Sequence, residues 1–400
     1  MITVNKPVFR PYEVVERKGL GHPDTLADGI SEAISRSLCR IYLEEFGEIL
    51  HHNVDKVLII AGQSSPRFSG GRIVKPPSVI VGGRASKTSS QPLGKVIERA
   101  AASHLHENLK NLSQFLVEPR LEEGAPELKS LMGKGANDTS IGVGYAPLSR
   151  TEKLVLDLEN AVRGVPGAGE DIKLMAVQIG ERLTLVVAVA MVSRFINSRE
   201  EYEEAKLAVR DAVAKMALDS LDGLHGLDER GHDTHMSSNI ASDLRASDPH
   251  AADLEVYVNC ADTVESIYLT ETGSSIEMGD DGATGRGNRG NGLITPMRPM
   301  TMEAIAGKNP VSHVGKIYNV LAARAASDIA NLDGVEEAYV TLVSKIGSPI
   351  SHPLLRAVQI SGEMALTPRL ESEVDSILDC WLESTDDLVE QFVNGSLSLY

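Results

Sequence analysis

The order in which strand-like and helix-like segments follow one another most constrains how this chain can fold. Segments rich in β-branched residues with partial apolar–polar alternation predict strands over residues 57–61, 79–81, 172–179, 183–192, 254–258, 266–269, 338–343 and 356–360. Amphipathic segments predict helices over residues 24–46, 93–112, 152–162, 200–221, 300–331 (interrupted near Pro310) and 368–392. Because strands more often come in pairs than singly between helices, we predict an α+β fold. Mixed sheets with helices on one face are favoured over a doubly wound parallel sheet.

The net charge excludes two classes of partner. The 400 residues include 39 Lys+Arg and 56 Asp+Glu, for a formal charge of −17. Binding to nucleic acid or to an anionic membrane would need a basic surface, so we expect neither partner. Eight acidic residues follow Arg369, on the polar face of the helix predicted over residues 368–392. Residues 279–316 instead carry five basic and three acidic side chains, which marks them as the place for an anion.

Cysteine usage and the apolar runs indicate a cytoplasmic protein. Cys39, Cys260 and Cys380 form no CxxC pair, so they are neither a disulfide framework nor a zinc site. Residues 1–17 lack the apolar region of a signal peptide. The longest apolar run, residues 183–192, is about half as long as a membrane helix. Residues 222–252, rich in Gly, Asp, Ser and His, predict a long loop whose histidines match no standard metal spacing.

A glycine turn that leads into a helix is the first candidate site. Residues 19–29 read Gly-Leu-Gly-His-Pro-Asp-Thr-Leu-Ala-Asp-Gly, in which the first two glycines allow a tight turn. Pro23 then opens a helix whose free N–H groups favour an anion. His22 stands there as a hydrogen-bond donor or proton carrier, and Asp24 and Asp28 lie one helical turn apart. An ordinary N-cap would equally explain the glycines and Pro23, but it gives His22 no role.

A second candidate is the glycine-rich segment 279–292, which has six glycines in fourteen residues. Such a loop can wrap phosphates with its backbone N–H groups. Asp280 and Asp281 are oxygen ligands of the kind that Mg²⁺ prefers. Arg286 and Arg289 can each bind two phosphate oxygens. The glycines satisfy GxGxxG, but Pro296 interrupts the helix that a dinucleotide site requires, and the charged residues argue against a plain linker.

Two further segments are weaker candidates when taken alone. Residues 307–316 contain Lys308 and Lys316, which can act as point charges on phosphate, but they lack the Walker A spacing. Beside residues 279–292 they predict a polyphosphate site with bound Mg²⁺. In residues 135–145, Asp138 is a possible ligand for a metal or substrate. The glycines of that segment equally indicate a strand against which a neighbour packs closely, and we favour this structural interpretation.

Together these segments resemble the S-adenosylmethionine synthetase (methionine adenosyltransferase) family, in its archaeal-type branch. Residues 16–24 resemble its N-terminal motif, 279–295 its phosphate loop and 303–319 its lysine segment, and residues 50–55 and 137–149 also match. The resemblance implies three similar α/β-layered domains around a pseudo-threefold axis. Their approximate boundaries would be residues 1–15 with 150–270, 16–117 with 271–320, and 118–149 with 321–400. It also implies a homodimer or larger homo-oligomer with shared active sites.

The resemblance further implies a reaction, cofactors and site residues. ATP, L-methionine and water would give S-adenosylmethionine, phosphate and diphosphate, by sulfur attack on C5′ of ATP and then hydrolysis of tripolyphosphate. The implied cofactors are Mg²⁺ and K⁺. The implied catalytic residues are His22 (a donor to the leaving oxygen), Lys173, Arg286 and Lys308, and the implied metal ligands are Asp24 and Asp280. The implied substrate-binding residues are Asp138, Asp280, Asp281, Arg289, His313, Lys316, Glu123, Gly124 and Ala125.

The chain departs from the family pattern at two places. Gly287 follows the loop arginine where the bacterial branch has a lysine, a place that Arg289 would take. Residues 122–127 hold one glycine and three acids where the archaeal branch has a glycine-rich ATP segment. We therefore keep, as an alternative, a Mg²⁺-dependent polyphosphate-hydrolysing or nucleotide-binding protein on the same scaffold.

Overall fold

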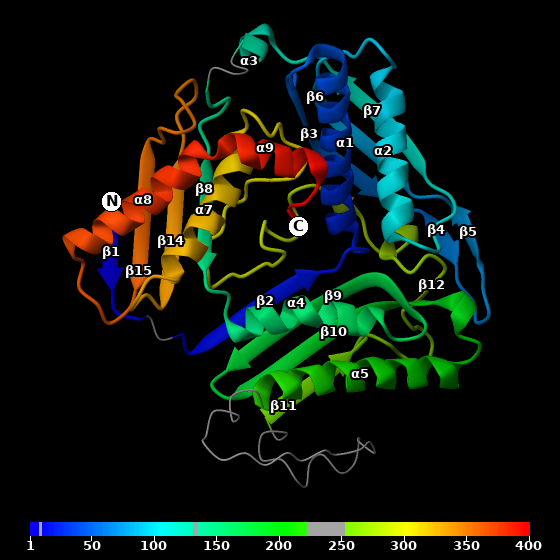
Figure 1. Ribbon diagram of the computed structural model, residues 1–400. Coiled ribbons are helices and arrows are strands. Elements are labelled where there is room, and N and C mark those ends of the chain that lie inside the picture. Colours follow the sequence, from blue (N-terminus) through cyan, green and yellow to red (C-terminus); the bar gives the residue numbers. More distant parts are fainter. Residues whose placement is uncertain (8–9, 131–134, 223–252) are drawn as a thin grey trace.

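The computed structural model describes residues 1–7, 10–130, 135–222 and 253–400 (Figure 1). It contains three larger β-sheets, each with helices packed on one face, and a two-stranded sheet of residues 63–65 and 72–75 (β4-β5). The helices are α1 (Pro23–Phe46), α2 (Leu93–Asn108), α3 (Pro126–Ser130), α4 (Arg150–Arg163), α5 (Arg199–Asp222), α7 (Val314–Ala330), α8 (Pro368–Glu383) and α9 (Thr385–Asn394), with 3-10 turns η1 (Ser193–Phe195) and η3 (Ser275–Glu277). The strands are β1 (Ile2–Asn5), β2 (Tyr12–Lys18), β3 (His52–Ile60), β4 (Gln63–Ser65), β5 (Arg72–Lys75), β6 (Ser78–Ala85), β7 (Leu116–Glu122), β8 (Ile141–Ala146), β9 (Ala168–Ile179), β10 (Arg182–Val192), β11 (Leu254–Val258), β12 (Leu269–Thr270), β13 (Gly282–Ala283), β14 (Glu337–Val343) and β15 (Leu355–Ser361). The loop predicted over residues 222–252 lies outside the described residues, except for Asp222.

Sheet A joins strands that are far apart in the sequence. Its order is β1-β15-β14-β8, with β1 parallel to β15 and the other neighbours antiparallel. Helix α7 lies on this sheet and α8 packs on α7, so that Leu321, Val340 and Val374 share one core. Strand β1, which lies in the predicted grouping of residues 1–15 with 150–270, pairs with β15, and the domain boundaries stay a prediction.

Sheets B and C are likewise mixed. Sheet B runs β11-β10-β9-β2, with β12 added to β10, and α4 packs on β9 with α5 beside it. Sheet C runs β13-β3-β6-β7, and α1 packs on β3 beside α2. Each sheet has its own apolar core, which includes Val155 and Val187 for sheet B and Ile34 and Val57 for sheet C. The predicted α+β class with mixed sheets is confirmed.

Most predicted elements are present, and the differences have physical reasons. Every predicted strand overlaps an observed one, but the predicted strands do not include β1, β2, β4, β5, β7, β8 and β13. The helix prediction over residues 300–331 was wrong in its first half, since α7 begins at Val314 and residues 301–313 form turns and loops. The predicted helix over residues 368–392 is two helices, α8 and α9, separated at Ser384.

The glycines of β8 explain why β-branched content did not indicate that strand. Gly142 and Gly144 lie directly under α7: a Cβ at Gly142 would overlap Tyr318, and one at Gly144 would overlap the backbone at Ala323. A strand that packs this closely on a helix needs residues without side chains, so the usual β-branched signal is absent. The structural interpretation of this segment's glycines is therefore confirmed.

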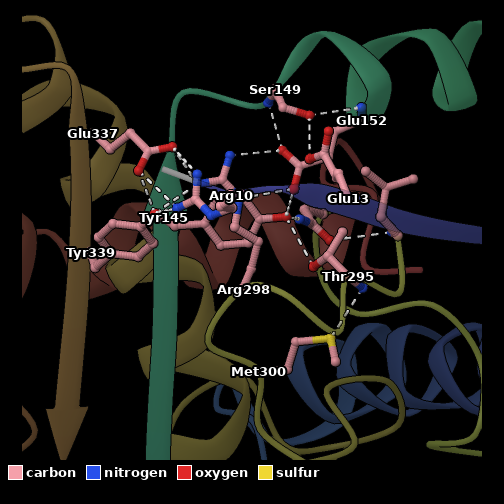
Figure 2. A network of polar contacts seen from close by, with 12 residues as sticks. Arg10, Glu13, Tyr145, Ser149, Glu152, Thr295, Arg298, Met300, Glu337 and Tyr339 are labelled. Atoms are coloured by element: carbon pink, nitrogen blue, oxygen red, sulfur yellow. Dashed lines mark hydrogen bonds and ion pairs between the residues drawn. The ribbon is translucent and has the colours of Figure 1, made fainter. Parts of the chain in front are cut away.

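A buried arginine connects sheet A to sheet B (Figure 2). Arg298, whose side chain is 2% exposed, pairs with Glu152 of α4 at 3.1 Å and with Glu337 of β14 at 2.7 Å. Arg10, from the segment between β1 and β2, also pairs with Glu337, at 2.9 Å. Burial disfavours the Glu337 carboxylate, but the hydrogen bonds from Arg10 and Tyr339 and the charge of Arg298 outweigh it and lower the pKa of Glu337 to about 2.

Within the described residues, no helix is both long enough and apolar enough to cross a membrane.

Candidate active site

The turn before α1 brings His22 to the start of that helix. Gly19 and Gly21 donate to the carbonyls of Ile172 (2.7 Å) and Glu170 (3.0 Å) on β9, so this turn runs along sheet B. A side chain at Gly21 would overlap the Glu170 backbone, which explains the glycine. With Pro23 at the first helical position, His22 becomes the N-cap, and its Nδ1 accepts the Asp24 N–H at 3.2 Å.

His22 is a neutral imidazole with its remaining N–H on Nε2. His22 is 6% exposed. Its burial lowers the pKa of the imidazole to about 4, because burial and the charges of Lys18 and Lys173 outweigh the charge of Asp24. A neutral ring whose Nδ1 accepts a hydrogen bond must carry its hydrogen on Nε2. His22 is therefore a hydrogen-bond donor at neutral pH, as its predicted role requires.

Helix α1 holds the glycine-rich loop by contacts along its first two turns. Asp24 Oδ1 accepts the Ala283 N–H at 2.9 Å, and Ser31 Oγ hydrogen-bonds Thr284 Oγ1 at 2.6 Å. Between these positions, Asp28 Oδ1 accepts the Gly285 N–H at 2.8 Å. Because the spacings of four and three residues place these side chains on one face of the helix, the loop lies along that face.

Lys18 joins the start of α1 to the loop from the side of sheet B. Its Nζ donates to Asp24 Oδ2 at 2.8 Å and to the Arg286 carbonyl at 2.9 Å. Lys173, on the neighbouring strand β9, pairs with Glu16 at 3.2 Å and acts electrostatically on His22. His22, Asp24, Lys173 and the loop thus come together as predicted, although Lys18 was not predicted.

The two loop arginines differ in what their side chains contact. Arg286 is exposed, and its guanidinium has no hydrogen bond or ion pair to any other described residue. Arg289 instead donates to the carbonyls of Gly285 (2.6 Å), Gly287 (2.8 Å) and Thr301 (3.3 Å). Of the pair, only Arg286 has a guanidinium without a partner among the described residues, and the predicted phosphate role of Arg289 stays a prediction.

The two predicted lysines of residues 307–316 are both buried and both paired with carboxylates. Lys308 is buried between Asp55, at 3.7 Å, and Glu303, and burial lowers its pKa. Lys316 is fully buried and donates two bonds to Glu32, at 2.7 and 2.8 Å. Its ammonium has a buried carboxylate as partner and joins α7 to α1, and its predicted role in substrate binding stays a prediction.

Predicted substrate residues gather around Lys308. Asp138 is exposed and acts electrostatically on Lys308. His313 caps α7, accepting the Gly315 N–H at 3.3 Å, and burial and the nearby lysines lower its pKa well below the usual value. Gly124 lies against the ring of His51, whose charge also acts on His313.

The remaining predicted residues are more exposed. Glu123 pairs with Lys87 at 3.5 Å and Lys129 at 3.0 Å, and Ala125 beside it is exposed. Asp280 and Asp281 are exposed at the start of the loop, where Asp281 accepts the Ala61 N–H at 2.7 Å. Asp280 and Asp281 belong to the loop that contacts α1, but their carboxylates make no hydrogen bond to α1 among the described residues.

Comparison with known proteins identifies the family. A family model described as S-adenosylmethionine synthetase (AdoMet synthetase) matches residues 3–396. S-adenosylmethionine synthases of Methanothermobacter thermautotrophicus and Pyrobaculum neutrophilum are 41% and 42% identical to this chain. The alignments cover 97% of this chain and 95% of the first relative, and all of both chains for the second. The chain belongs to the S-adenosylmethionine synthetase family.

A solved structure agrees with this S-adenosylmethionine synthetase fold. An unusual S-adenosylmethionine synthetase from Campylobacter jejuni superposes with a TM-score of 0.61 over 98% of this chain and 94% of that chain, at 17% identity. The predicted resemblance is thus confirmed, as is the prediction of an enzyme of the transferase class.

The residues of this S-adenosylmethionine synthetase fit a metal that arrives with the substrate. Within the described residues, no three His, Cys, Asp or Glu side chains converge as a metal site. Mg²⁺ commonly uses one or two carboxylates together with substrate phosphates and water. Asp24, fixed by Ala283 and Lys18, and the exposed Asp280 supply such carboxylates beside the loop.

Sequence reasoning gave no role to several residues that shape the site. Asp28, Ser31, Asp55, Glu303 and Lys18 all contact the loop or Lys308. Asp28 had a usable signal, because it lies four residues after Asp24 and so on the same helical face. Asp55 and Glu303 are brought to Lys308 by tertiary packing, which no local spacing indicates.

Proposed function

We propose that this protein is a methionine adenosyltransferase that converts ATP, L-methionine and water to S-adenosylmethionine, phosphate and diphosphate. One observation carries the proposal: the guanidinium of Arg286, exposed and without a partner among the described residues, stands on a loop fastened to α1, whose N-cap is His22. A guanidinium fork and a helix N-terminus are both anion-binding groups. Together they form a site for the triphosphate of ATP with the bond to C5′ near His22.

In the first step the methionine sulfur attacks C5′ of the ribose, so a C–S bond forms while the C5′–O5′ bond breaks. The leaving triphosphate gains negative charge on O5′. The Nε2–H of His22 donates a hydrogen bond to that oxygen and stabilises the charge as it develops. Because His22 is buried and neutral, its ring already carries the Nε2–H that this hydrogen bond needs.

Mg²⁺ and K⁺ are the proposed cofactors. Asp24 and Asp280 would hold Mg²⁺ together with phosphate oxygens. Bound there, Mg²⁺ neutralises charge on the phosphates in both the adenosyl-transfer and hydrolysis steps. K⁺ stays a prediction that rests on the family resemblance.

The basic residues on either side of α1 bind the polyphosphate in this proposal. Arg286 binds it on the loop, Lys173 from β9, and Lys308 beside Asp55 and Glu303. Asp138 and Asp281 lie at the edges, where the methionine or nucleoside would contact them. Glu123, Gly124, Ala125 and His313 lie on the Lys308 side and are proposed as nucleotide contacts.

We also propose a pseudo-threefold arrangement of the three domains and a homodimer. Supporting the first, each of sheets A, B and C has helices on one face and a separate core. Supporting the second, strand side chains on the opposite faces are exposed and apolar: Leu58, Ile60, Leu116, Ile141, Val186, Tyr257 and Leu355. Such apolar patches on a sheet are typical of surfaces covered by another chain.

A product assay tests the proposed reaction. The protein is incubated with ATP, Mg²⁺ and K⁺, with and without methionine, and S-adenosylmethionine, phosphate and diphosphate are quantified. We expect methionine-dependent S-adenosylmethionine formation. ATP turnover without an adenosylated product contradicts the proposal, and tripolyphosphate cleavage that ignores methionine supports the alternative hydrolase.

A variant of His22 tests the proposed chemistry. His22→Ala removes the donor to O5′ and should lower kcat about 10²-fold to 10³-fold, with a much smaller change in ATP affinity. His106→Ala, at an exposed histidine of α2, is the control and should keep normal activity. A kcat near that of the wild type in His22→Ala would remove His22 from the mechanism.

A further inference from the structure

The loop around Arg286 has a flexible backbone by its sequence. Arg286 lies between Gly285 and Gly287, and glycine loses more backbone freedom on ordering than any other residue. A long, exposed guanidinium on such a backbone would bind an anion weakly unless other groups fix the chain. The described contacts show which groups do so.

Asp28 fixes the loop from the side of α1. Its residue is 3% exposed, and its Oδ1 accepts the Gly285 N–H at 2.8 Å. A Cβ at Gly287 would lie 2.6 Å from Asp28 Oδ2, so the second carboxylate oxygen borders the backbone on the far side of Arg286. Gly285 has φ of +84°, a conformation that favours glycine. Gly285 is therefore needed for its backbone conformation, and Gly287 for the space beside Asp28.

Arg289 fixes the same backbone by binding the carbonyls of the two glycines. Its guanidinium donates to the carbonyls of Gly285 at 2.6 Å and Gly287 at 2.8 Å, the residues on either side of Arg286. The third contact, to the Thr301 carbonyl, anchors the guanidinium to the segment after the loop. Charged donors make stronger hydrogen bonds to carbonyls than neutral ones do.

With these contacts, most polar backbone groups next to Arg286 have a partner. The Gly285 N–H binds Asp28, the Arg286 N–H binds the Ala283 carbonyl at 3.2 Å, and the Arg286 carbonyl binds Lys18. The guanidinium of Arg286 has no such partner within the described part of the chain.

We infer that Asp28 and Arg289 are positioning residues that act through Arg286, holding the loop backbone from opposite sides so that this guanidinium meets the phosphates of the substrate. This inference rests on the proposed function. It assigns Asp28 a role and gives Arg289 a different role from direct phosphate binding. Neither residue needs to touch the substrate.

A double-mutant cycle tests the inference. Binding of inorganic diphosphate to the full chain, with Mg²⁺ present, is measured by titration calorimetry for Asp28→Ala, Arg286→Gln and the double variant. Each single change should weaken binding about tenfold, the scale of one hydrogen bond to a charged group. Because Asp28 acts through Arg286, the double variant should bind within about twofold of Arg286→Gln alone.

Two further variants guard against a trivial loss of folding. Asp28→Asn keeps an oxygen for the Gly285 N–H and should recover most of the affinity, within about threefold of wild type. Glu44→Gln removes a charge from an exposed position of the same helix and should bind normally.

The second positioning residue is tested in the same way. Arg289→Met should repeat the effect of Asp28→Ala and should likewise be non-additive with Arg286→Gln.

The outcomes separate this inference from the proposed function. Additive losses, about a hundredfold in the double variant, would show that Asp28 acts elsewhere and would overturn the inference. Wild-type affinity in Asp28→Ala, or in Arg286→Gln, would overturn it as well. Failure of the proposed function would appear instead as absence of S-adenosylmethionine in the wild-type product assay.

Discussion

The guanidinium of Arg286 is exposed and unpaired among the described residues, whereas the ammonium of Lys316 is fully buried against Glu32. Both residues are basic and both lie in the locally basic stretch 279–316. Their chemistry differs because a buried ion pair is already neutralised, and separating it would leave a charge without water or partner. Sequence composition predicted where an anion would bind, but it could not show which of these cations already has a partner inside the fold.

This contrast predicts opposite effects of two substitutions. Lys316→Met leaves Glu32 buried and unpaired and should lower the free energy of unfolding by about 3–5 kcal/mol, measured in urea. Lys345→Met, at an exposed lysine, is the control and should change stability little. Arg286→Gln should leave stability unchanged while it weakens diphosphate binding. A stable Lys316→Met that loses diphosphate affinity would return Lys316 to the phosphate site.

At the scale of elements, local sequence predicted those strands whose side chains carry the packing. Strands β9 and β10 were found because their β-branched residues fill the core of sheet B. Strand β8 was missed because Gly142 and Gly144 let the backbone of α7 supply that packing. Helix α7 was predicted too long because residues 301–313 have apolar residues at helical intervals. That segment is not helical in the structure, where Gly307 has φ of +78°.

Contact between β8 and α7 predicts a strict need for glycine. Gly144→Ala places a methyl group into the α7 backbone, so the helix must move away from sheet A, at a cost of about 1–3 kcal/mol in the free energy of unfolding. Gly164→Ala, after α4, is the matched control, since φ there is −74° and a Cβ would have no close neighbour. Equal stabilities for the two variants would contradict the close packing seen here.

For the whole molecule, the network around Arg298 is the main described polar link between sheets A and B (Figure 2). Its members come from four separate parts of the chain, so no motif or spacing indicates it. The same holds for the cluster of Asp55, Glu303 and Lys308. The motifs at residues 19–29 and 279–292 were predictable because their chemistry is local in sequence, but their partners across the fold were not.

This network predicts a stability that depends on pH. The pKa of Glu337 is lowered from its usual 4.5 to about 2, so its carboxylate stabilises the fold fully above about pH 5. That contribution is lost as the pH falls from 4.5 towards 2, because the unfolded chain takes up the proton first. The stability difference between wild type and Glu337→Gln in urea should therefore shrink between pH 6 and pH 3.5.

A neighbouring position supplies the control for this measurement. Glu336 is exposed, and Glu336→Gln should match the wild type at both pH values. A difference between wild type and Glu337→Gln that stays constant from pH 6 to pH 3.5 would contradict the ionised, paired state of Glu337.

The parallel pairing of β1 with β15 has a consequence for synthesis on the ribosome. The amino group of Met1 contacts the carbonyl of Arg356, across a separation of 355 residues. β1 leaves the ribosome before every other described strand and has no neighbour in sheet A until residues 355–361 have followed it. A nascent chain therefore carries an unpaired strand through most of translation, so that sheet A is completed late, by a contact that closes one of the longest loops in the molecule.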